Sequence, residues 1–194
     1  MKTAWRIVVV ACVLSTLTGC DSSNQAKINS DTAKIGADLF KQQNAARQQM
    51  EAVSKQMGIA YIPSFGHEQG VVTWVNFAWA DPNVDAPQSQ QSNIVDLSPL
   101  RELVGLKSLA IANTKVSDLS PLKEMKLKEL CIESTLVVDL SPLRGMPLRA
   151  LRLDFQPERD AEILRSIKTL ETINDKPATE FWREVEEQKK EKSP

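Results

Sequence analysis

One pentapeptide, Asp-Leu-Ser-Pro-Leu, occurs three times in this chain, at residues 96–100, 118–122 and 139–143. The copies are offset by 22 and then 21 residues. A period of this length marks a small supersecondary unit that cannot bury its apolar face alone and has to stack on its neighbours. The repeats therefore predict a stack of similar units with one open face, a surface used more often for binding than for chemistry.

Apolar residues recur at matching positions after each pentapeptide, with spacing Leu-x-x-Leu-x-Ile or Leu-x-x-Leu-x-Leu. They are Leu106, Leu109 and Ile111, then Leu127, Leu130 and Ile132, then Leu148, Leu151 and Leu153. This spacing predicts one short strand per repeat, with alternate residues directed into the core. Each Ser-Pro pair predicts a short helix or 3₁₀ turn, with the Ser hydroxyl as N-cap and Pro at the first helical position.

Other polar residues recur with the same period. The Asp of each pentapeptide is expected to hold its turn through side-chain to backbone hydrogen bonds, because it lacks the clustered oxygen ligands that calcium requires. Thr114, Thr135 and Gln156 occupy a second recurring position and are expected to form hydrogen bonds along the stack.

Residues 94–182, through these motifs, resemble the leucine-rich repeat superfamily, and are most similar to bacterial repeats of the internalin type. The segment from Ile173-Asn174-Asp175-Lys176-Pro177 to Phe181-Trp182 resembles the close of similar repeats in planctomycete-like proteins. The resemblance implies an α/β fold: a short solenoid of about four turns, with an N-terminal helix and a helical C-terminal cap. It also implies binding of protein or glycan.

The N-terminus has the pattern of an export signal. Lys2 and Arg6 precede an apolar run, residues 7–17, that is too short to span a bilayer comfortably. The following Leu17-Thr18-Gly19-Cys20 resembles the lipobox of bacterial lipoproteins, which implies cleavage before Cys20, a diacylglycerol thioether on its sulfur, and acylation of the new N-terminus, typically with palmitate. The alternative is an ordinary cleaved signal peptide. Asp21 resembles the enterobacterial signal for inner-membrane retention, which favours the periplasmic side of the inner membrane over the outer membrane.

The remaining chain divides by composition. The predicted parts are the signal 1–19, a flexible tether 20–30, an amphipathic helix 31–57, an N-terminal cap 58–93 with a strand at 71–79, the repeats 94–182 and a charged tail 183–194. The helix carries an apolar stripe at spacings of three and four, made of Ile35, Leu39, Phe40, Ala46, Met50, Val53 and Met57. We expect it to pack on the repeats; the alternative is a self-associating coiled coil.

Charge and cysteine content narrow the function. Loss of the two basic signal residues changes the formal net charge from −1 to −3. The chain therefore lacks the excess of basic residues that is typical of nucleic-acid-binding proteins. Cys12 lies in the signal and Cys20 is the lipidation site, so Cys131 has no intramolecular disulfide partner. His67 is the one histidine, with no cysteine or second histidine near it in sequence, and we therefore predict no metal site and no cofactor.

Residues between the core positions are expected to form rows across the open face of the stack. The rows are Ser108, Glu129 and Ala150; Ala110, Cys131 and Arg152; and Ala112, Glu133 and Asp154. Glu129, Glu133, Arg152 and Asp154 form the best candidate binding patch; alternatively, Arg152 simply pairs with its acidic neighbours on a solvated face. Trp74, Phe77 and Trp79 either cap the core or, if exposed, form an aromatic binding platform.

Catalysis is not expected. Nothing in the sequence builds a cleft around Glu129 and Glu133, and Cys131 has no nearby base except His67 in another part of the chain. An enzyme would require a deep pocket that holds Glu133 and His67 together. The sequence thus predicts a membrane-anchored, non-catalytic lipoprotein that binds a protein or a cell-wall glycan. The alternative is a structural tether that self-associates through residues 31–57.

Overall fold

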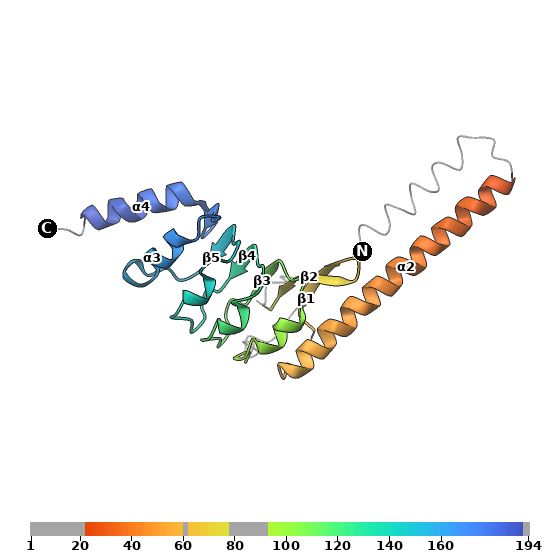
Figure 1. Cartoon of the computed structure of the whole chain (residues 1–194), viewed down its shortest axis with the longest axis horizontal. Coiled ribbons are helices and arrows are strands. Elements are labelled where there is room, and N and C mark those ends of the chain that lie inside the picture. Colours follow the sequence, from red (N-terminus) through yellow and green to blue (C-terminus); the bar gives the residue numbers. More distant parts are fainter. Residues whose placement is uncertain (1–21, 60–61, 78–92, 192–194) are drawn as a thin grey trace. The chain divides into compact units, whose positions relative to one another are not determined.

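The computed structural model describes residues 22–59, 62–77 and 93–191. The predicted signal, Cys20, Asp21 and Trp79 lie outside these residues. The chain divides into two compact units, Met1–Lys41 and Gln42–Pro194, and the division falls within helix α2 (Ser22–Gln56). The fold is mixed α/β, with one seven-stranded sheet whose strands follow one another in sequence order from β1 to β7 (Figure 1).

The centre of the sheet is parallel. It runs through β2 (Val71–Asn76), β3 (Ser108–Ala110), β4 (Glu129–Cys131), β5 (Ala150–Arg152) and β6 (Thr172–Ile173). The strands expected after each pentapeptide are thus observed, and each pairs with the strand one repeat away. The repeat period sets the register, since Ser108 lies opposite Glu129 and Glu129 opposite Ala150.

An antiparallel hairpin closes the sheet at each end. The first joins β1 (Ser64–Glu68) to β2, and the last joins β6 to β7 (Lys176–Pro177). Both turns place two successive residues at positive φ, Gln69 and Gly70 in one and Asn174 and Asp175 in the other, as two-residue hairpin turns of the primed type require. Neither β1 nor β7 was predicted from the sequence.

A 3₁₀ turn follows each Asp-Leu pair: η1 (Ser98–Glu102), η2 (Ser120–Leu122) and η3 (Ser141–Leu143). In each repeat the Ser backbone N–H donates to the Asp carboxylate two residues earlier, at 2.8 Å. The role predicted for the Asp residues is therefore confirmed. The prediction that each Ser is the N-cap is wrong. A Leu occupies the N-cap position of each turn, and its side chain cannot form a capping hydrogen bond.

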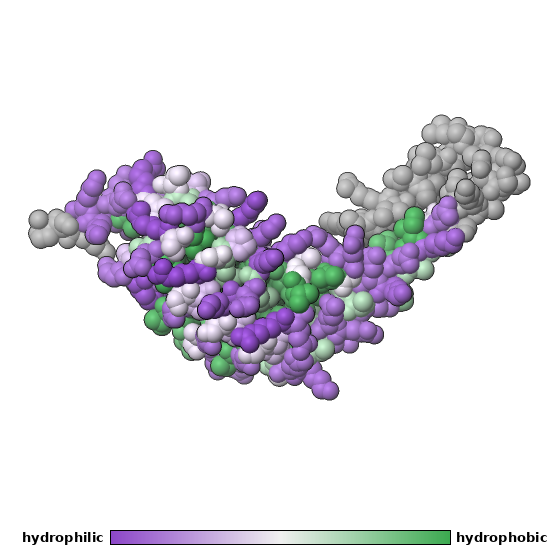
Figure 2. All heavy atoms as spheres, viewed as in Figure 1, coloured by the Kyte–Doolittle hydropathy of each residue, from purple (hydrophilic) through white to green (hydrophobic). Residues whose placement is uncertain are grey.

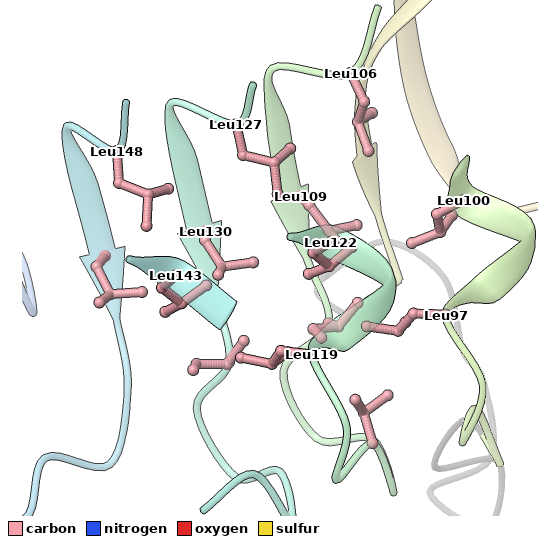
Figure 3. Close-up of a cluster of buried hydrophobic side chains, with 14 of the residues drawn as sticks. Leu97, Leu100, Leu106, Leu109, Leu119, Leu122, Leu127, Leu130, Leu143 and Leu148 are labelled. Atoms are coloured by element: carbon pink, nitrogen blue, oxygen red, sulfur yellow. The ribbon is translucent and has the colours of Figure 1, made fainter. Parts of the chain in front are cut away.

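Leucine side chains from the strands and the 3₁₀ turns meet in one core (Figure 3). Leu109, Leu122 and Leu143 are almost completely buried, as are their counterparts in neighbouring repeats. Burying a leucine contributes about 1.5–3 kcal/mol. The core therefore runs continuously from repeat to repeat, and no single repeat encloses it.

Two expected polar contacts differ from the prediction. The hydroxyls of Thr114 and Thr135 donate within their own repeats, to the carbonyl oxygens of Ile111 and Ile132, both at 2.8 Å. Side-chain bonds between neighbouring repeats come from other residues, among them Asn174, which exchanges two hydrogen bonds with the Leu153 backbone, at 2.9 and 3.0 Å. The turn of the last hairpin thus ties itself to the preceding repeat.

Helix α2 is longer than expected, because it begins at Ser22 and includes most of the segment predicted as a flexible tether. In the second unit, Ala46, Met50 and Val53 are buried in the common core. These residues lie at helical spacing, so one face of this part of α2 closes the core beside the first hairpin.

The first unit contains the preceding part of the same stripe. There Ile35, Leu39 and Phe40 are 55%, 47% and 66% exposed. Figure 2 shows hydrophobic residues at the surface of this part of α2. Within the first unit, much of the apolar stripe of α2 is therefore exposed to solvent.

The C-terminal end of the core is closed by α3 (Pro157–Ser166) and α4 (Ala178–Glu191). Phe155, Phe181 and Trp182 pack edge to face with ring centroids 5.0–5.9 Å apart, and the Arg165 guanidinium lies 4.2 Å from the Trp182 centroid. Most residues of the predicted charged tail thus belong to helix α4. At the other end, β2 stops at Asn76, so the strand predicted at 71–79 is shorter, and its last residues lie outside the described chain.

Candidate functional site

The side chains that point away from the core along the parallel strands form what we call the open face. Leu109, Leu130 and Leu151 are buried, whereas their neighbours on either side in each strand are at least partly accessible. Strand register aligns these accessible residues in two rows. Row 1 is Trp74, Ser108, Glu129, Ala150 and Thr172; row 2 is Asn76, Ala110, Cys131 and Arg152. Neighbours within a row are separated by about 4.8 Å of strand spacing.

Trp74 extends row 1 beyond the residues predicted for it. Its side chain is 44% exposed, which resolves the question of whether this ring is buried in the core. The ring packs against the backbone of its strand partner Gly66, where an added Cβ would stand 2.0 Å from Trp74 Nε1. The indole is therefore held against β1 at one end of the open face.

Phe77, in contrast, is 2% exposed and belongs to the core, so it is not part of an exposed platform. The residue after it and Trp79 lie outside the described residues. Of the predicted aromatic group, Trp74 is the member that the structure places at the surface.

Arg152 is the centre of the charged part of the face. Its guanidinium lies 2.9 Å from the Glu133 carboxylate and 3.4 Å from the Asp175 carboxylate. These two charges, Glu133 first, hold the pKa of Arg152 above its ordinary value. The pairing is the one given from the sequence as the alternative to a binding patch, and the use of these residues in binding stays a prediction. Asp175 was missed because it belongs to the last hairpin, outside the three aligned repeats.

The other predicted patch residues have separate roles. Asp154 Oδ2 accepts a hydrogen bond from the Ser134 backbone N–H at 2.6 Å, which ties two repeats together at a residue with φ of 54°. Glu129 is exposed, and the described part of the chain offers it no side-chain partner. The four patch residues are therefore one ion pair (Arg152 and Glu133), one structural aspartate (Asp154) and one carboxylate without such a partner (Glu129).

A shallow hollow of about 220 Å³ lies in the middle of the open face. Its floor is made of small side chains, since Ser108, Ala110 and Ala150 lie between larger residues. The remaining accessible side chains around it are Glu129, Cys131, Arg152, Thr172 and Asp175. The hollow thus has an apolar floor and a charged border, with Trp74 one strand further along row 1.

Cys131 lies in the hollow as a half-buried thiol. Burial raises its pKa above the ordinary value, and its Sγ lies 3.6 Å from Glu133 Oε2. His67 belongs to β1, three strands from β4, so sheet order separates it by about 14 Å of strand spacing from both Cys131 and Glu133. The group beside the thiol is thus the Glu133 carboxylate, and within the described residues His67 does not share a pocket with either of them.

A larger hollow of about 520 Å³ lies on the opposite, turn side of the repeats, between the first two. It opens where the first repeat has one extra residue, and it is lined by Val104, Leu106 and Met125 with Arg101, Glu124 and Lys126 among its polar residues. None of the predicted site residues lies there. In the described part of the chain, no three His, Cys, Asp or Glu side chains are grouped so that they could hold a metal ion.

No helix in the described ranges is both long and apolar enough to cross a membrane.

No protein-family model matches the chain, and no curated protein matches it. Among solved structures, the chain is similar to an internalin (inlF) from Listeria monocytogenes, at 31% identity and a TM-score of 0.35 over 42% of this chain and 25% of that one. It is also similar to internalin C2 (inlC2) from the same species, at 14% identity and a TM-score of 0.42 over 64% and 51%. These structural neighbours are leucine-rich repeat proteins, and this chain spans a quarter to a half of their length.

Proposed function

We propose that this chain is a short leucine-rich repeat solenoid that binds a protein partner through its open face, while a lipid on Cys20 holds it at a membrane. The observation that carries the proposal is the exposed Trp74 indole, fixed against Gly66 in the same row as the hollow. Large aromatic side chains dominate the binding energy of protein interfaces.

The composition of the face supports a binding role. A partner side chain that enters the hollow would contact the small residues Ser108, Ala110 and Ala150 and then meet charges at its border. Arg152 is already positioned by Glu133 and Asp175, so a partner group would find it pre-organised. Glu129 would supply a carboxylate for a cationic group of the partner, because it is exposed and without an ion pair here.

A non-catalytic role fits the same geometry. The hollow is shallow, and the carboxylates around it are exposed. The pKa of the Cys131 thiol in it is raised, first by burial, so little of the reactive thiolate forms at neutral pH. The Glu133 carboxylate lies 3.6 Å from the sulfur, but its negative charge also raises the thiol pKa and so disfavours the nucleophilic thiolate.

The membrane anchor rests on the N-terminal sequence. Lys2, Arg6, the apolar run and Leu17-Thr18-Gly19-Cys20 resemble a lipoprotein signal, and several acyl chains together would anchor the chain firmly. We place the protein in the cell envelope, with Asp21 favouring the inner membrane facing the periplasm. Mass spectrometry of the mature protein tests this: a diacylglyceryl group on Cys20 is expected, and an unmodified Cys20 would overturn the anchor.

The binding proposal is tested by cross-linking and affinity purification of the full-length protein from its native membranes. The variants are Trp74→Ala and the triple change Glu129→Lys, Glu133→Lys and Arg152→Glu. The matched control is Val138→Ala, which also removes an exposed apolar side chain but lies outside the open face. A protein captured by the wild type and the control, and lost from both test variants at unchanged melting temperature, supports the proposal.

Two outcomes would contradict it. Equal capture by all forms would mean that the open face is not the binding surface. A captured species that resists protease and is released by cell-wall hydrolases would make the ligand a glycan, which is the alternative partner class.

A second function is favoured by one specific observation in the first unit. Ile35, Leu39 and Phe40 are exposed on α2, as they would be in a helix that associates with a copy of itself. In this alternative the protein is a structural tether. Analytical ultracentrifugation of the full-length protein in detergent, beside a variant with Ile35→Gln and Leu39→Gln, separates the two. A concentration-dependent oligomer that the variant loses supports the tether, and a monomer at all concentrations excludes it.

A further inference from the structure

Three basic residues form a further row, next to row 1 of the open face. Lys107, Lys128 and Arg149 each stand one residue before a parallel strand. Their backbones follow one another across the sheet, since the Lys128 N–H donates to Lys107 O and the Arg149 N–H to Lys128 O, both at 2.7 Å. We call these three residues the basic row. Its members are about 4.8 Å apart at the backbone, the spacing of neighbouring strands.

Acidic residues close the basic row at both ends. Glu68 of β1 forms an ion pair with Lys107 at 2.6 Å, and Glu171, just before β6, pairs with Arg149 at 3.6 Å. Lys128 in the middle is exposed, and no ion pair within the described ranges involves it. Across the sheet, Thr73 of β2 lies between Glu68 and Lys107, and Glu171 follows Arg149 directly.

The existing ion pairs leave the basic row available to a ligand. Both are exposed pairs, a class that contributes little to stability, so an incoming anion can replace them. Neighbouring like charges also repel one another along the row, and a ligand with several carboxylates would relieve that repulsion.

We propose that the basic row binds an acidic helical segment of the protein partner. Side chains three and four residues apart on a helix stand about 5–6 Å apart, close to the strand spacing of the row. A helix with carboxylates at positions i, i+4 and i+7 therefore presents three anions in step with the three cations. In an extended chain, side chains on one face are about 7 Å apart, which does not match.

The closing acids select the length of the ligand. A long polyanion, such as a nucleic acid or a charged glycan, would continue past the basic row and meet Glu68 or Glu171, which would repel it. A short acidic stretch would end at the basic row, where it displaces Glu68 and Glu171 from Lys107 and Arg149 and does not extend past them. This favours a protein segment with about three carboxylates over an extended polymer.

The inference rests on the proposed function, because each residue of the basic row directly precedes a row 1 residue of the open face. Lys107 precedes Ser108, Lys128 precedes Glu129, and Arg149 precedes Ala150. One partner can therefore insert a side chain beside Trp74 and lay an acidic helix along the basic row. Trp74 would supply the anchor, and the basic row would set the orientation of the partner.

The test uses a fluorescein-labelled, alanine-based helical peptide with Glu at i, i+4 and i+7, and a second peptide with Gln at these positions. Fluorescence anisotropy measures binding to the full-length protein in uncharged detergent at low salt. The variant is Lys128→Glu. The matched control is Lys126→Glu, an equal charge change at an exposed residue two positions earlier, on the turn side.

We expect the Glu peptide to bind the wild type and the control alike, and the Lys128→Glu variant about tenfold more weakly. The Gln peptide should bind all forms weakly, and binding of the Glu peptide should fall with added salt. Equal weakening by Lys126→Glu and Lys128→Glu would overturn the inference, because it would show diffuse attraction. If Lys128→Glu weakened binding to phosphatidylglycerol vesicles relative to phosphatidylcholine vesicles but left peptide binding unchanged, the inference would be overturned in favour of a lipid surface.

The outcomes are separable from those of the proposed function. If Trp74→Ala loses the native partner but Lys128→Glu does not affect peptide binding, the open face stands and the basic row fails. If Lys128→Glu abolishes peptide binding while Trp74→Ala retains the native partner, the basic row stands and the open face fails.

Discussion

The indole of Trp74 lies directly over Gly66 on the neighbouring antiparallel strand, so the ring occupies the space that any side chain at residue 66 would need. Glycine is thus required for packing, at a position where φ is not left-handed. The aromatic group of the proposed binding face depends on the absence of a side chain one strand away.

Gly66→Ala should rotate the indole away from β1, because the nearest atoms to the new methyl group belong to the movable ring. We expect an off-rotamer strain of about 1 kcal/mol in unfolding free energy, and a shifted Trp74 indole N–H signal in NMR spectra. The control is Gly36→Ala, where no atom lies within 4 Å of the new methyl group and the helix should gain stability. Unchanged spectra for Gly66→Ala would contradict this packing.

Leu119→Ala should destabilise the protein by about 2–5 kcal/mol, because the side chain is 1% exposed between neighbouring repeats and its removal leaves a cavity. Val138→Ala, at a residue that is 62% exposed, should change stability by less than about 0.5 kcal/mol. Urea unfolding of both variants measures the difference. Similar losses in the two variants would mean that the core is not shared between repeats as described.

Asp160→Ala should cost about 2–3 kcal/mol of unfolding free energy. The carboxylate is completely buried, accepts the Gln156 backbone N–H at 2.8 Å at the start of α3, and receives two bonds from Arg159 at 2.6 and 2.9 Å. Glu158→Ala is the control, since Glu158 is exposed in the same first turn. Thermal unfolding should show a clear decrease in Tm for the first variant only.

Stability should fall in acid through the three pentapeptide aspartates. The Ser backbone N–H, followed by the Ser hydroxyl, lowers the pKa of Asp96 and Asp139, and the same two groups in reverse order lower the pKa of Asp118. Because the folded pKa lies below the unfolded one, this stabilisation is present above about pH 4 and is lost as pH falls through the folded pKa. Urea midpoints of the wild type and the triple Asp→Asn variant should converge below about pH 4; a constant gap would contradict the prediction.

Cys131 should react slowly with iodoacetamide in the native protein. Burial raises the pKa of its thiol, so little thiolate is present at neutral pH. We expect alkylation to be about tenfold slower in the native state than in urea, with the Cys131 peptide followed by mass spectrometry. Equal rates in both states would show that the hollow does not shield the sulfur.

The parts of the fold that follow from the repeat period were predictable from the sequence. Leu106, Leu109 and Ile111 recur in three copies, and identical spacing leads to identical strands in register. The pairing of Arg152 with Glu133 followed from the same alignment, since Arg152 ends β5 and Glu133 lies two residues after the end of the neighbouring β4.

The ends of the sheet could not be predicted in this way. Strand β1 contains Gly66 and His67, which have no strong preference for strands, and β7 has two residues including a proline. Both are held by pairing with a neighbour that only the folded chain supplies. The Asn174-Asp175 turn did carry a signal, because these residue types tolerate positive φ, and it would have revealed Asp175 beside Arg152.

The limits of α2 were missed for a different reason. Residues 22–30 contain no proline or glycine that would end a helix, and their polar composition is equally compatible with a spacer. Ala46, Met50 and Ile35 also belong to one periodic stripe, although the first two are buried and Ile35 is exposed. Periodicity identifies the stripe but not which part of it finds a neighbour.

The regular register of β3, β4 and β5 has an evolutionary consequence. Each strand pairs only with the strands beside it, and the residues between successive copies begin and end at equivalent points of the chain. Duplication of a DNA segment encoding about 21 residues would therefore add a strand without disturbing the hairpins at the two ends, and loss of such a segment would remove one. The width of the open face can therefore change by whole repeats through recombination alone.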